Sequence, residues 1–517
     1  MSVDDSTSFD KPNLSPQQIA QELQELSQQL QLFIPDAAAR GDSFDGVERK
    51  IWESVRQIGF QAMELFLSLQ GQGDIGQNAS TEDGKKLVRS AAPANTTVRS
   101  IFGNHEFQQY HYSAGKNRAI ELRPISARIG LPQQRWSFLL QEFSQLFCVE
   151  SAFNQASSNM QTVLGGNFSI DTLERTNLRV GKDAGRYLSD LPTPKRKDEG
   201  KILVATADCK GVPLVKKDAA KVAAFETAKK RPGNRRMATV TSVYSVDQFV
   251  RSPQSIIEAL FRDEQGESAS IESKNRPKPK SKNTTAHFPT IVTDDDNEIR
   301  ISGIHEGMAW MAQQVDARRG KNQKLVVLMD GQESLWDTAA LHWDDENVVE
   351  ILDFLHVAVY IWEASGLFGL DRAGKEKFTR QRLEKLLSGE ANSVIRGLRR
   401  MGTLHGLGGE HQKDLARICG YLEKHQSRMA YDVYLREGYP IASGVIEGAC
   451  RHLVKDRMER SGMRWTLEGA RSMLNVRAAF QSDHWEDFLS ERIKEQSAST
   501  HTNRKMVSNY TALTLSC

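Results

Sequence analysis

Residues 324–337 read KLVVLMDGQESLWD, and this stretch decides the fold class. Five apolar residues run directly into Asp330 and Gly331. An apolar run of this length is typical of a strand buried on both faces, as in a sheet covered by helices. An acid just past the end of such a strand lies where open α/β sheets bind their ligands. The stretch therefore predicts an α/β protein with a functional acid at the edge of its sheet.

A second stretch upstream repeats this pattern. Residues 202–208 read ILVATAD, again an apolar run that ends in an acid, Asp208. If the two strands are neighbours, Asp208 and Asp330 lie close together, and their repulsion is unfavourable unless a cation lies between them. Carboxylate oxygens suit Mg²⁺ or Mn²⁺. The alternative for each aspartate is that it simply begins a turn, because DG and DCKG are good turn sequences.

A third acid lies far along the chain, in residues 440–465, PIASGVIEGACRHLVKDRMERSGMRW. The pattern predicts a helix with Glu447 in its first turn, where an acid also stabilises the helix dipole. Gly448 beside it leaves room for a ligand or another backbone, at a cost to the helix of about 1 kcal/mol relative to Ala. Arg451 and Lys455 follow one and two turns later on the same face. An acid with basic neighbours along one face suits a metal–phosphate site.

Composition excludes several classes of protein. The chain has 517 residues, 39% of them hydrophobic and 26% charged, which is ordinary for a globular protein of two to four domains. No apolar run reaches the roughly 18 residues that span a bilayer, and the N-terminus has no signal-peptide pattern. Five scattered cysteines without a CxxC motif indicate reduced thiols in a cytoplasmic protein and no structural zinc site.

Positive charge is concentrated in one segment. The formal net charge is only +2, but residues 210–236 hold nine Lys or Arg against two acids. A local excess of this kind indicates a polyanion partner such as nucleic acid. The alternative is a solvated surface loop.

Periodicity predicts the elements along the chain. Helices are expected at 15–33 and about 45–70, a linker at 71–96, and strands within 97–124. A helix, a glycine turn at Gly165-Gly166 and a second helix capped by Ser169 follow, in the pattern of a helix-turn-helix. We further expect strands at 202–208, 212–216, 237–246, 298–303, 324–330 and 348–354, a surface loop or disordered insertion at 264–288, and helices from 356 to about 481.

The order of these elements is that of an RNase H-like fold: a strand with Asp, two strands, a helix, a strand with Asp, a helix, a strand and a late helix with Glu. Glu447 lies 117 positions after Asp330, so a helical insertion must lie between them. The expected regions are an N-terminal helical region and linker (1–96), a β-hairpin and helix-turn-helix-like DNA-binding region (97–190), the first part of an RNase H-like catalytic core (200–365), an inserted all-helical domain (366–440), the last core helices (441–490) and a disordered tail (491–517).

Several stretches resemble one known family, the DDE transposases of bacterial insertion sequences, of the Kra-type group related to mutator-like transposases. The longest is GYPIASGVIEGACRHLVKDRMERSGMRWTLEGARSMLNVRAAF at 438–480. The others are RSIFG, WSFLLQEFSQLF, TADCKGVPLVKKDAAK, AKKRPGNRRMATVTSVYSV, VLMDGQESLWDTA, VEILDFLHVAVYIW and VIRGLRRMGTL. Together they extend the resemblance over roughly residues 97–490.

The resemblance implies the roles of individual residues. Asp208, Asp330 and Glu447 match the family's three catalytic acids, which hold two Mg²⁺ or Mn²⁺ ions. Asp353 and His356, in LDFLH, match the DxxH of mutator-like relatives, with His356 orienting a phosphate or the attacking group. The alternative for His356 is a hydrogen-bonded core residue. Two departures are Cys209, which stands where the family commonly has glycine, and the segment YHYSAGKNRA, which lacks the cysteines of a zinc ribbon.

The resemblance also implies partners and activity. The protein is expected to bind the terminal inverted repeats of its element and target DNA as a homodimer or higher oligomer, to cleave and transfer DNA strands, and to act at the bacterial nucleoid. The DNA backbone would be held by Lys216, Lys217, Lys229, Lys230, Arg231, Arg235, Arg236, Arg451, Lys455 and Arg460. The alternatives are an RNase H-like nuclease without strand transfer and an inactive DNA-binding descendant.

Overall fold

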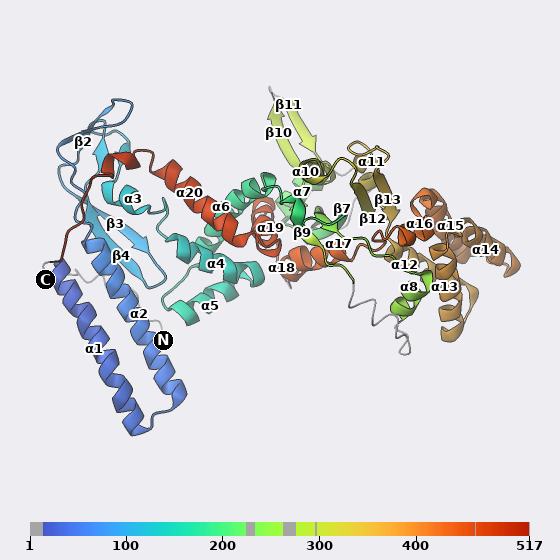
Figure 1. The fold of residues 1–517 in the computed structure, drawn as a ribbon, viewed down its shortest axis with the longest axis horizontal. Coiled ribbons are helices and arrows are strands. Elements are labelled where there is room, and N and C mark those ends of the chain that lie inside the picture. The colour runs from blue at the N-terminus through green and yellow to red at the C-terminus, as the bar shows by residue number, and fades with distance from the viewer. Residues whose placement is uncertain (1–13, 224–232, 262–275, 295–296, 461, 516–517) are drawn as a thin grey trace. The chain divides into compact units, whose positions relative to one another are not determined.

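The computed structural model of the chain forms two compact units (Figure 1). The structure describes residues 14–223, 233–261, 276–294, 297–460 and 462–515. The first unit comprises residues 1–176 and 486–517, and the second comprises residues 177–485. No helix among the described residues is both long enough and apolar enough to cross a membrane.

The first unit begins with two long helices, α1 (Pro16–Arg40) and α2 (Phe44–Ser68). The Ser15 hydroxyl accepts from the backbone of Gln18 in a capping box, and Ser43 caps α2 in a similar way. Both predicted helices are confirmed. The first is longer than expected because its Pro35 does not end it.

Strands fill the region that was predicted to be a linker. A four-stranded sheet has the order β1-β2-β5-β6, and β3 pairs with β4 in an antiparallel hairpin. The prediction of a linker at 71–96 is therefore wrong. Leu87 in β2 is fully buried, which explains why this polar segment folds. The strands are β1 (Asn78–Ser80), β2 (Lys86–Arg89), β3 (Ala94–Arg99), β4 (Asn104–Gln109), β5 (Tyr112–Ser113) and β6 (Ile120–Leu122).

The C-terminal segment also packs on the first unit. It forms α20 (Trp485–Thr500) and the short η5 (Arg504–Val507). The Tyr510 hydroxyl donates to the carbonyl of Gln70 (2.7 Å) and accepts from the backbone N–H of Gly73 (3.0 Å). The prediction of a disordered tail is therefore wrong as far as residue 515.

The predicted helix–glycine turn–helix is present. Gly165 and Gly166 separate α5 from α6 and have φ angles of +73° and +74°, which L side chains rarely adopt. The Ser169 hydroxyl accepts from the N–H of Thr172 (3.2 Å), as a helix cap does. The helices here are α3 (Pro124–Ile129), α4 (Phe138–Glu150), α5 (Phe153–Leu164) and α6 (Ile170–Ser189).

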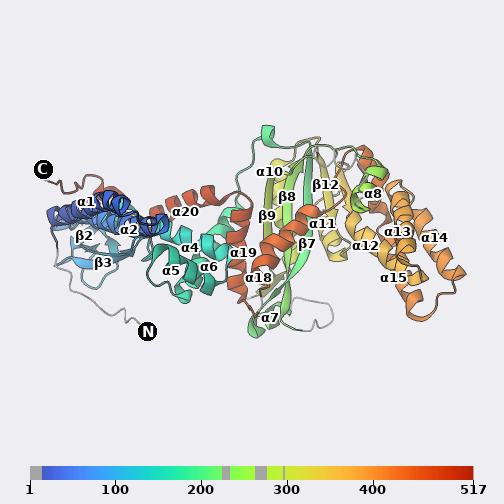
Figure 2. The same cartoon turned by 90° about the horizontal axis from the view of Figure 1, so that it is seen from below.

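A mixed sheet forms the centre of the second unit (Figure 2). Among the described residues its strand order is β13-β12-β7-β8-β9, with β13, β12 and β7 parallel and β8 and β9 antiparallel to their neighbours. The chain is thus of the α/β class, as predicted. The strands are β7 (Ile202–Pro213), β8 (Arg235–Val246), β9 (Lys280–His287), β12 (Lys324–Met329) and β13 (Val348–Leu352).

Two predictions about this sheet are wrong. The strands expected at 202–208 and 212–216 are one continuous strand, β7, which pairs with β8 along its whole length. Part of the loop expected at 264–288 is β9, the edge strand of the sheet; residues 262–275 lie outside the described part of the chain. A hairpin of β10 (Thr290–Asp294) and β11 (Asn297–Ile301) follows, where a single strand was expected.

Helices cover both faces of the sheet. On one face of the sheet, Gly307 of α10 lies against Thr239 and Thr241 of β8. On the opposite face, Cys450 of η4 contacts Asp208 of β7. The two contacts lie on opposite faces because Asp208 pairs with the residue between the two threonines, and side chains alternate along a strand. The bounds of the helices around the sheet are η1 (Arg196–Asp198), α7 (Lys216–Ala223), α8 (Pro253–Phe261), α10 (Gly303–Arg318), α11 (Glu333–Ala339), α12 (Phe354–Ser365), α17 (Gly444–Ala449), η4 (Cys450–Lys455), α18 (Asp456–Met458) and α19 (Leu467–Gln481).

The helices of the insertion share one hydrophobic core with the sheet. Val326 and Leu328 of β12 belong to the same buried cluster as Leu383, Leu398 and Leu422 of the inserted helices. The insertion is therefore an extension of the second unit rather than an independent body. Its helices are η2 (Gly366–Phe368), α13 (Arg372–Leu387), α14 (Ala391–Leu404), α15 (Gly409–Lys424), η3 (Gln426–Arg428) and α16 (Tyr431–Arg436).

Candidate active site

Three aspartates form one row across the three parallel strands. The register of β7 and β12 puts Asp330 level with Asp208, because each lies three residues past the last bridged pair. The register of β12 and β13 puts Asp330 level with Asp353, because each lies one residue past the last pair. Neighbouring strands are about 4.8 Å apart. The fold therefore gathers the two predicted aspartates, and a third, at one edge of the sheet.

Asp208 lies within β7 and is not a turn residue. Its backbone pairs with Val240 of β8, and β7 continues for five more residues. The Cys209 side chain contacts Thr239 on the other face of the sheet, so this departure from the family pattern places no side chain beside Asp208. On the Asp208 face, the buried Cys450 thiol donates to Oδ2 of Asp208 (3.3 Å). Burial raises the pKa of Cys450 well above its usual range, so this group remains a protonated donor.

Asp330 does begin a turn, and the turn is tightly packed. Its Oδ1 accepts from the N–H of Gln332 (2.9 Å). Gly331 leaves no space for a side chain, because a Cβ there would lie 2.1 Å from the ring of Tyr421 in α15. Burial raises the pKa of Asp330, and the negative charges of Asp208 and Asp353 raise it further, while the Gln332 N–H lowers it. Tyr421 of the inserted helices thus packs against the turn that carries Asp330.

Asp353 is fully buried and its oxygens are already occupied. Oδ1 accepts from the N–H groups of Leu355 (2.9 Å) and Ser443 (3.3 Å). Oδ2 accepts from the Ser443 hydroxyl (2.5 Å) and contacts Nδ1 of His356 (2.7 Å). A carboxylate with this many donors holds its neighbours in place. Asp353 therefore orients His356 and the chain that leads into α17.

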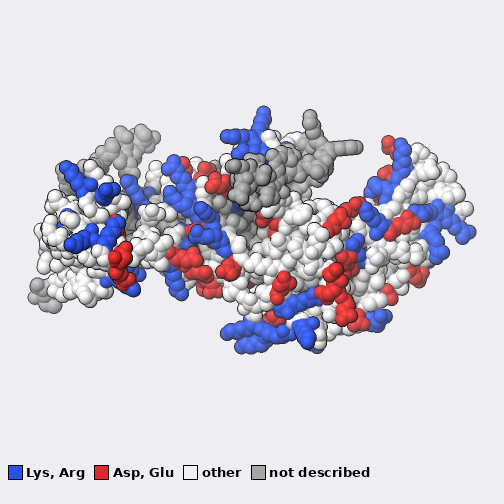
Figure 3. All heavy atoms as spheres, turned by 90° about the horizontal axis from the view of Figure 1, so that it is seen from above, with Lys and Arg blue, Asp and Glu red and all other residues white. Residues whose placement is uncertain are grey.

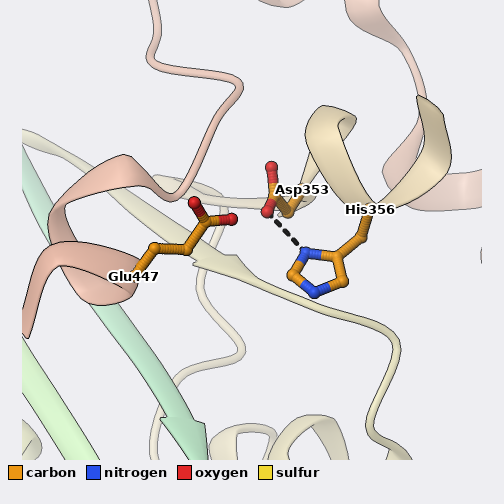
Figure 4. Close-up of side chains that lie close together, drawn as sticks. All are labelled: Asp353, His356 and Glu447. Carbon is orange, nitrogen blue, oxygen red and sulfur yellow. Dashed lines mark hydrogen bonds and ion pairs between the residues drawn. The ribbon is translucent and has the colours of Figure 1, made fainter. Parts of the chain in front are cut away.

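His356 is half exposed and faces Glu447 (Figure 4). Potential ligand atoms of Asp353, His356 and Glu447 all lie within 4.8 Å of one another. The hydrogen bond to Asp353 raises the pKa of His356 to about 9; burial opposes this rise, and the charges of Asp353, Asp330 and Glu447 support it. With this pKa the ring is an imidazolium at neutral pH when no cation is bound beside it, and in that form it donates to an anion.

Glu447 is exposed, in the first turn of α17, and its carboxylate points toward Asp353 and His356 (Figure 4). Partial burial raises its pKa, the charges of Asp353 and Asp208 add to the rise, and His356 opposes it. Glu447 is thus electrostatically coupled to the row of aspartates on the sheet.

Three of these acids are the best candidates to hold a cation. Asp353 already accepts hydrogen bonds at both oxygens, whereas Asp208, Asp330 and Glu447 offer further carboxylate oxygens to a cation. The negative charge of Asp208 raises the pKa of both Asp330 and Glu447, and a divalent cation beside these carboxylates would relieve that repulsion. Carboxylate oxygens of this kind fit Mg²⁺ or Mn²⁺.

The predicted DNA-binding residues fall into three groups. Those on the surface are Lys216 and Lys217 at the start of α7, Arg235 in β8, and Arg451, Lys455 and Arg460 beyond Glu447. Lys229, Lys230 and Arg231 lie outside the described residues. The buried one is Arg236, which donates to the carbonyls of Ala219 (2.7 Å), Gly233 (3.1 Å) and Arg235 (2.7 Å). Its prediction as a DNA contact does not fit this burial.

Sequence reasoning missed Ser443 and Cys450. Ser443 supports Asp353 from the segment before α17, and no sequence pattern points to that contact. Cys450 lies three residues after Glu447, so helical spacing alone could have placed it beside the site. None of the family models compared with this chain matches it, and the search of curated proteins finds no relative.

Proposed function

We propose that this chain is a DDE-type transposase that binds the terminal inverted repeats of its element, cleaves DNA strands and joins them to a target. The observation that carries the proposal is the row of Asp208, Asp330 and Asp353 across the three parallel strands, with Glu447 of a late helix within 4.8 Å of Asp353. A site of this composition is suited to metal-dependent phosphoryl transfer.

The order of the elements supports an RNase H-like core. The strand with Asp208 precedes β8, β9 and the helix α10, then come β12 with Asp330, α11 and β13, and finally α17 with Glu447. The hairpin of β10 and β11 is an addition to that order. The inserted helices enter between β13 and α17, as the spacing of the acids requires.

The carboxylates fit two Mg²⁺ or Mn²⁺ ions. When bound, such ions would supply charge neutralisation for the attacking and leaving oxygens of an in-line displacement at phosphorus. Asp208, on the central strand β7, would hold both ions, and Asp330 and Glu447 would each hold one of them. The chain's own contribution is to hold these three oxygen donors in place from two strands and a helix.

His356 supplies a cation beside these acids. Asp353, which is itself held by Ser443, fixes the ring, and the His356 side chain stays 40% exposed, so it is accessible to a ligand. We assign it the role of donating a hydrogen bond to a phosphate oxygen, where it would stabilise the charge that develops during displacement.

Basic surfaces support DNA as the substrate. On α6 the exposed side chains of Arg175, Arg179, Lys182 and Arg186 recur every three or four residues and so share one helix face. Figure 3 shows Lys and Arg gathered in several patches, one of them over the inserted helices at the right-hand end of the view. These side chains would contact phosphates and position DNA without reading its sequence. Joining two element ends to a target at the nucleoid would require at least a dimer.

Asp330→Asn provides the direct test. Purified protein is incubated with Mg²⁺ and DNA that carries the ends of its own element, and cleavage and joining are measured separately. We expect the variant to lose at least about 100-fold in both. Asp337→Asn, an exposed acid in α11, is the matched control and should behave as wild type.

The outcomes separate the alternatives. Cleavage without joining by the wild type would identify an RNase H-like nuclease. DNA-end binding with neither reaction would identify an inactive descendant. Equal joining by wild type and Asp330→Asn would remove Asp330 from the site.

A further inference from the structure

The helix that carries Glu447 changes its winding directly after the acid. α17 ends at Ala449 and continues as η4, a π-helix over Cys450–Lys455. The N–H of Asp456 reaches back five residues to the carbonyl of Arg451, as in a π-turn. Such segments hold one extra residue per turn; they are rare, and they frequently occur at functional sites.

Two side chains of α19 bind the carbonyls of this segment. Arg477 is 1% exposed; its Nε donates to the carbonyl of Leu453 (2.8 Å) and its Nη2 to that of His452. Gln481, one turn further along α19, also donates to the carbonyl of His452 (3.0 Å). A π-helix interrupts the regular backbone hydrogen bonds of an α-helix. The side chains of Arg477 and Gln481 therefore supply hydrogen bonds to its carbonyls from another helix.

The extra residue sets the direction of Glu447. Val454 near the end of the π-helix and Met458 beyond it are buried, and they fix that part of the helix against the unit. Removing one residue from a helix rotates the turns before it by about 100° relative to the turns after it. If η4 rewound as an α-helix, Glu447 would therefore turn away from the row of aspartates.

We propose that Arg477 is a positioning residue for the metal site, because it holds the π-helix that directs Glu447 toward Asp208 and Asp330. The inference rests on the assignment of these three acids as metal ligands. The guanidinium of Arg477 is buried and does not itself reach the metal site, so it acts on the site through the π-helix. Supporting residues of this kind typically alter metal affinity by about 10- to 100-fold.

Mn²⁺ binding to the full chain, measured by electron paramagnetic resonance without DNA, tests the inference. We expect Arg477→Met to raise the dissociation constant by about 10- to 100-fold. Arg477→Lys keeps one donor and should fall between the variant and the wild type. Gln481→Leu removes only the second bond to His452 and should give the smallest shift in the same direction.

Arg318→Gln is the matched control. Arg318 in α10 is also buried, pairs with Glu199 and donates to the carbonyl of Val243 (3.2 Å), so its loss also loosens the second unit. We expect a lower melting temperature and unchanged Mn²⁺ affinity. An equal shift in Arg318→Gln, wild-type affinity in Arg477→Met, or no Mn²⁺ binding by the wild type would each overturn the inference. Mn²⁺ binding by a wild type that does not cut DNA would instead reject the proposed function and leave the positioning role standing.

Discussion

His105 in β4 and His356 in α12 make the same contact in different surroundings. Nδ1 of His105 lies 2.6 Å from Glu64, and Nδ1 of His356 lies 2.7 Å from Asp353. The His105 side chain is fully buried, its Nε2 contacts the Ser100 hydroxyl (2.7 Å), and Phe60 stacks on its ring. The His356 side chain is 40% exposed, and within the described residues its Nε2 has no hydrogen-bond partner.

The difference in exposure and in hydrogen bonding at Nε2 separates a structural carboxylate–histidine pair from one that can bind a ligand. With both nitrogens occupied and no solvent access, His105 joins α2 to the β3–β4 hairpin and can bind nothing else. Ser100, His105 and Glu64 resemble a hydrolytic triad in composition, but the Ser100 side chain is buried and its hydroxyl also accepts from the N–H of Phe102. His356 keeps one nitrogen for a ligand. We therefore expect His105 to be a structural residue and His356 a functional one.

The largest expected effect comes from His356→Gln. Loss of a charged donor beside the reacting phosphate should lower the rate of strand cleavage by about 10²- to 10³-fold. Folding should change by less than about 1 kcal/mol, because the side chain is partly exposed. Single-turnover cleavage of a pre-bound element end gives the rate, and thermal unfolding gives the stability.

Position 105 provides the matched substitution. If His105→Gln lowers cleavage by the folded protein as much as His356→Gln does, the contrast between the two histidines is lost. If His356→Gln cleaves DNA at the wild-type rate, His356 is a hydrogen-bonded structural residue and takes no part in the reaction.

The second effect is on stability. His105→Leu removes two buried hydrogen bonds and leaves the Glu64 carboxylate without its partner, which should lower the free energy of unfolding by about 2–4 kcal/mol. The cleavage rate per folded molecule should stay at the wild-type value. Thermal unfolding followed by circular dichroism, together with an activity titration well below the melting temperature, measures both quantities. A melting temperature equal to that of the wild type would show that this contact does not hold α2 to the hairpin.

The row of acids is predictable from the sequence because the apolar run of each strand leads directly into an aspartate. The runs before Asp208 and Asp330 end in an acid, and VVEILD at 348–353 repeats the pattern for Asp353. Parallel pairing then brings such ends together without further information. Glu447 could be placed on a helix, but not relative to the sheet, because the chain between them adds a whole group of helices.

Other features depend on contacts that no local pattern shows. β9 is polar, KSKNTTAH, and is a strand because β8 offers it a hydrogen-bonding edge. The tail is ordered because Tyr510 reaches Gln70 and Gly73, which lie 440 and 437 positions earlier in the chain. The carbonyls of the π-helix accept from Arg477, which lies in α19. In each case the decisive partner is distant in sequence.

The smallest expected effect is the pH dependence of stability. The pKa of His356 rises from 6.5 to about 9 on folding, first because of its hydrogen bond to Asp353. The imidazolium therefore stabilises the folded state fully below pH 6.5, and this contribution disappears as the pH rises through 9. Because the side chain is 40% exposed, solvent screening limits the contribution to about 1 kcal/mol or less.

Melting temperatures of wild type and His356→Gln between about pH 6 and about pH 10 measure this contribution. The wild type should lose its advantage over the variant as the pH rises, by about 2–4 °C at most. The same comparison at position 105 separates the two histidines, because the penalty of His105→Leu comes mainly from buried contacts and should persist across this range. A constant difference between wild type and His356→Gln would mean that folding does not raise the pKa of His356. The ring would then be largely neutral at neutral pH and free to act as a metal ligand beside Glu447.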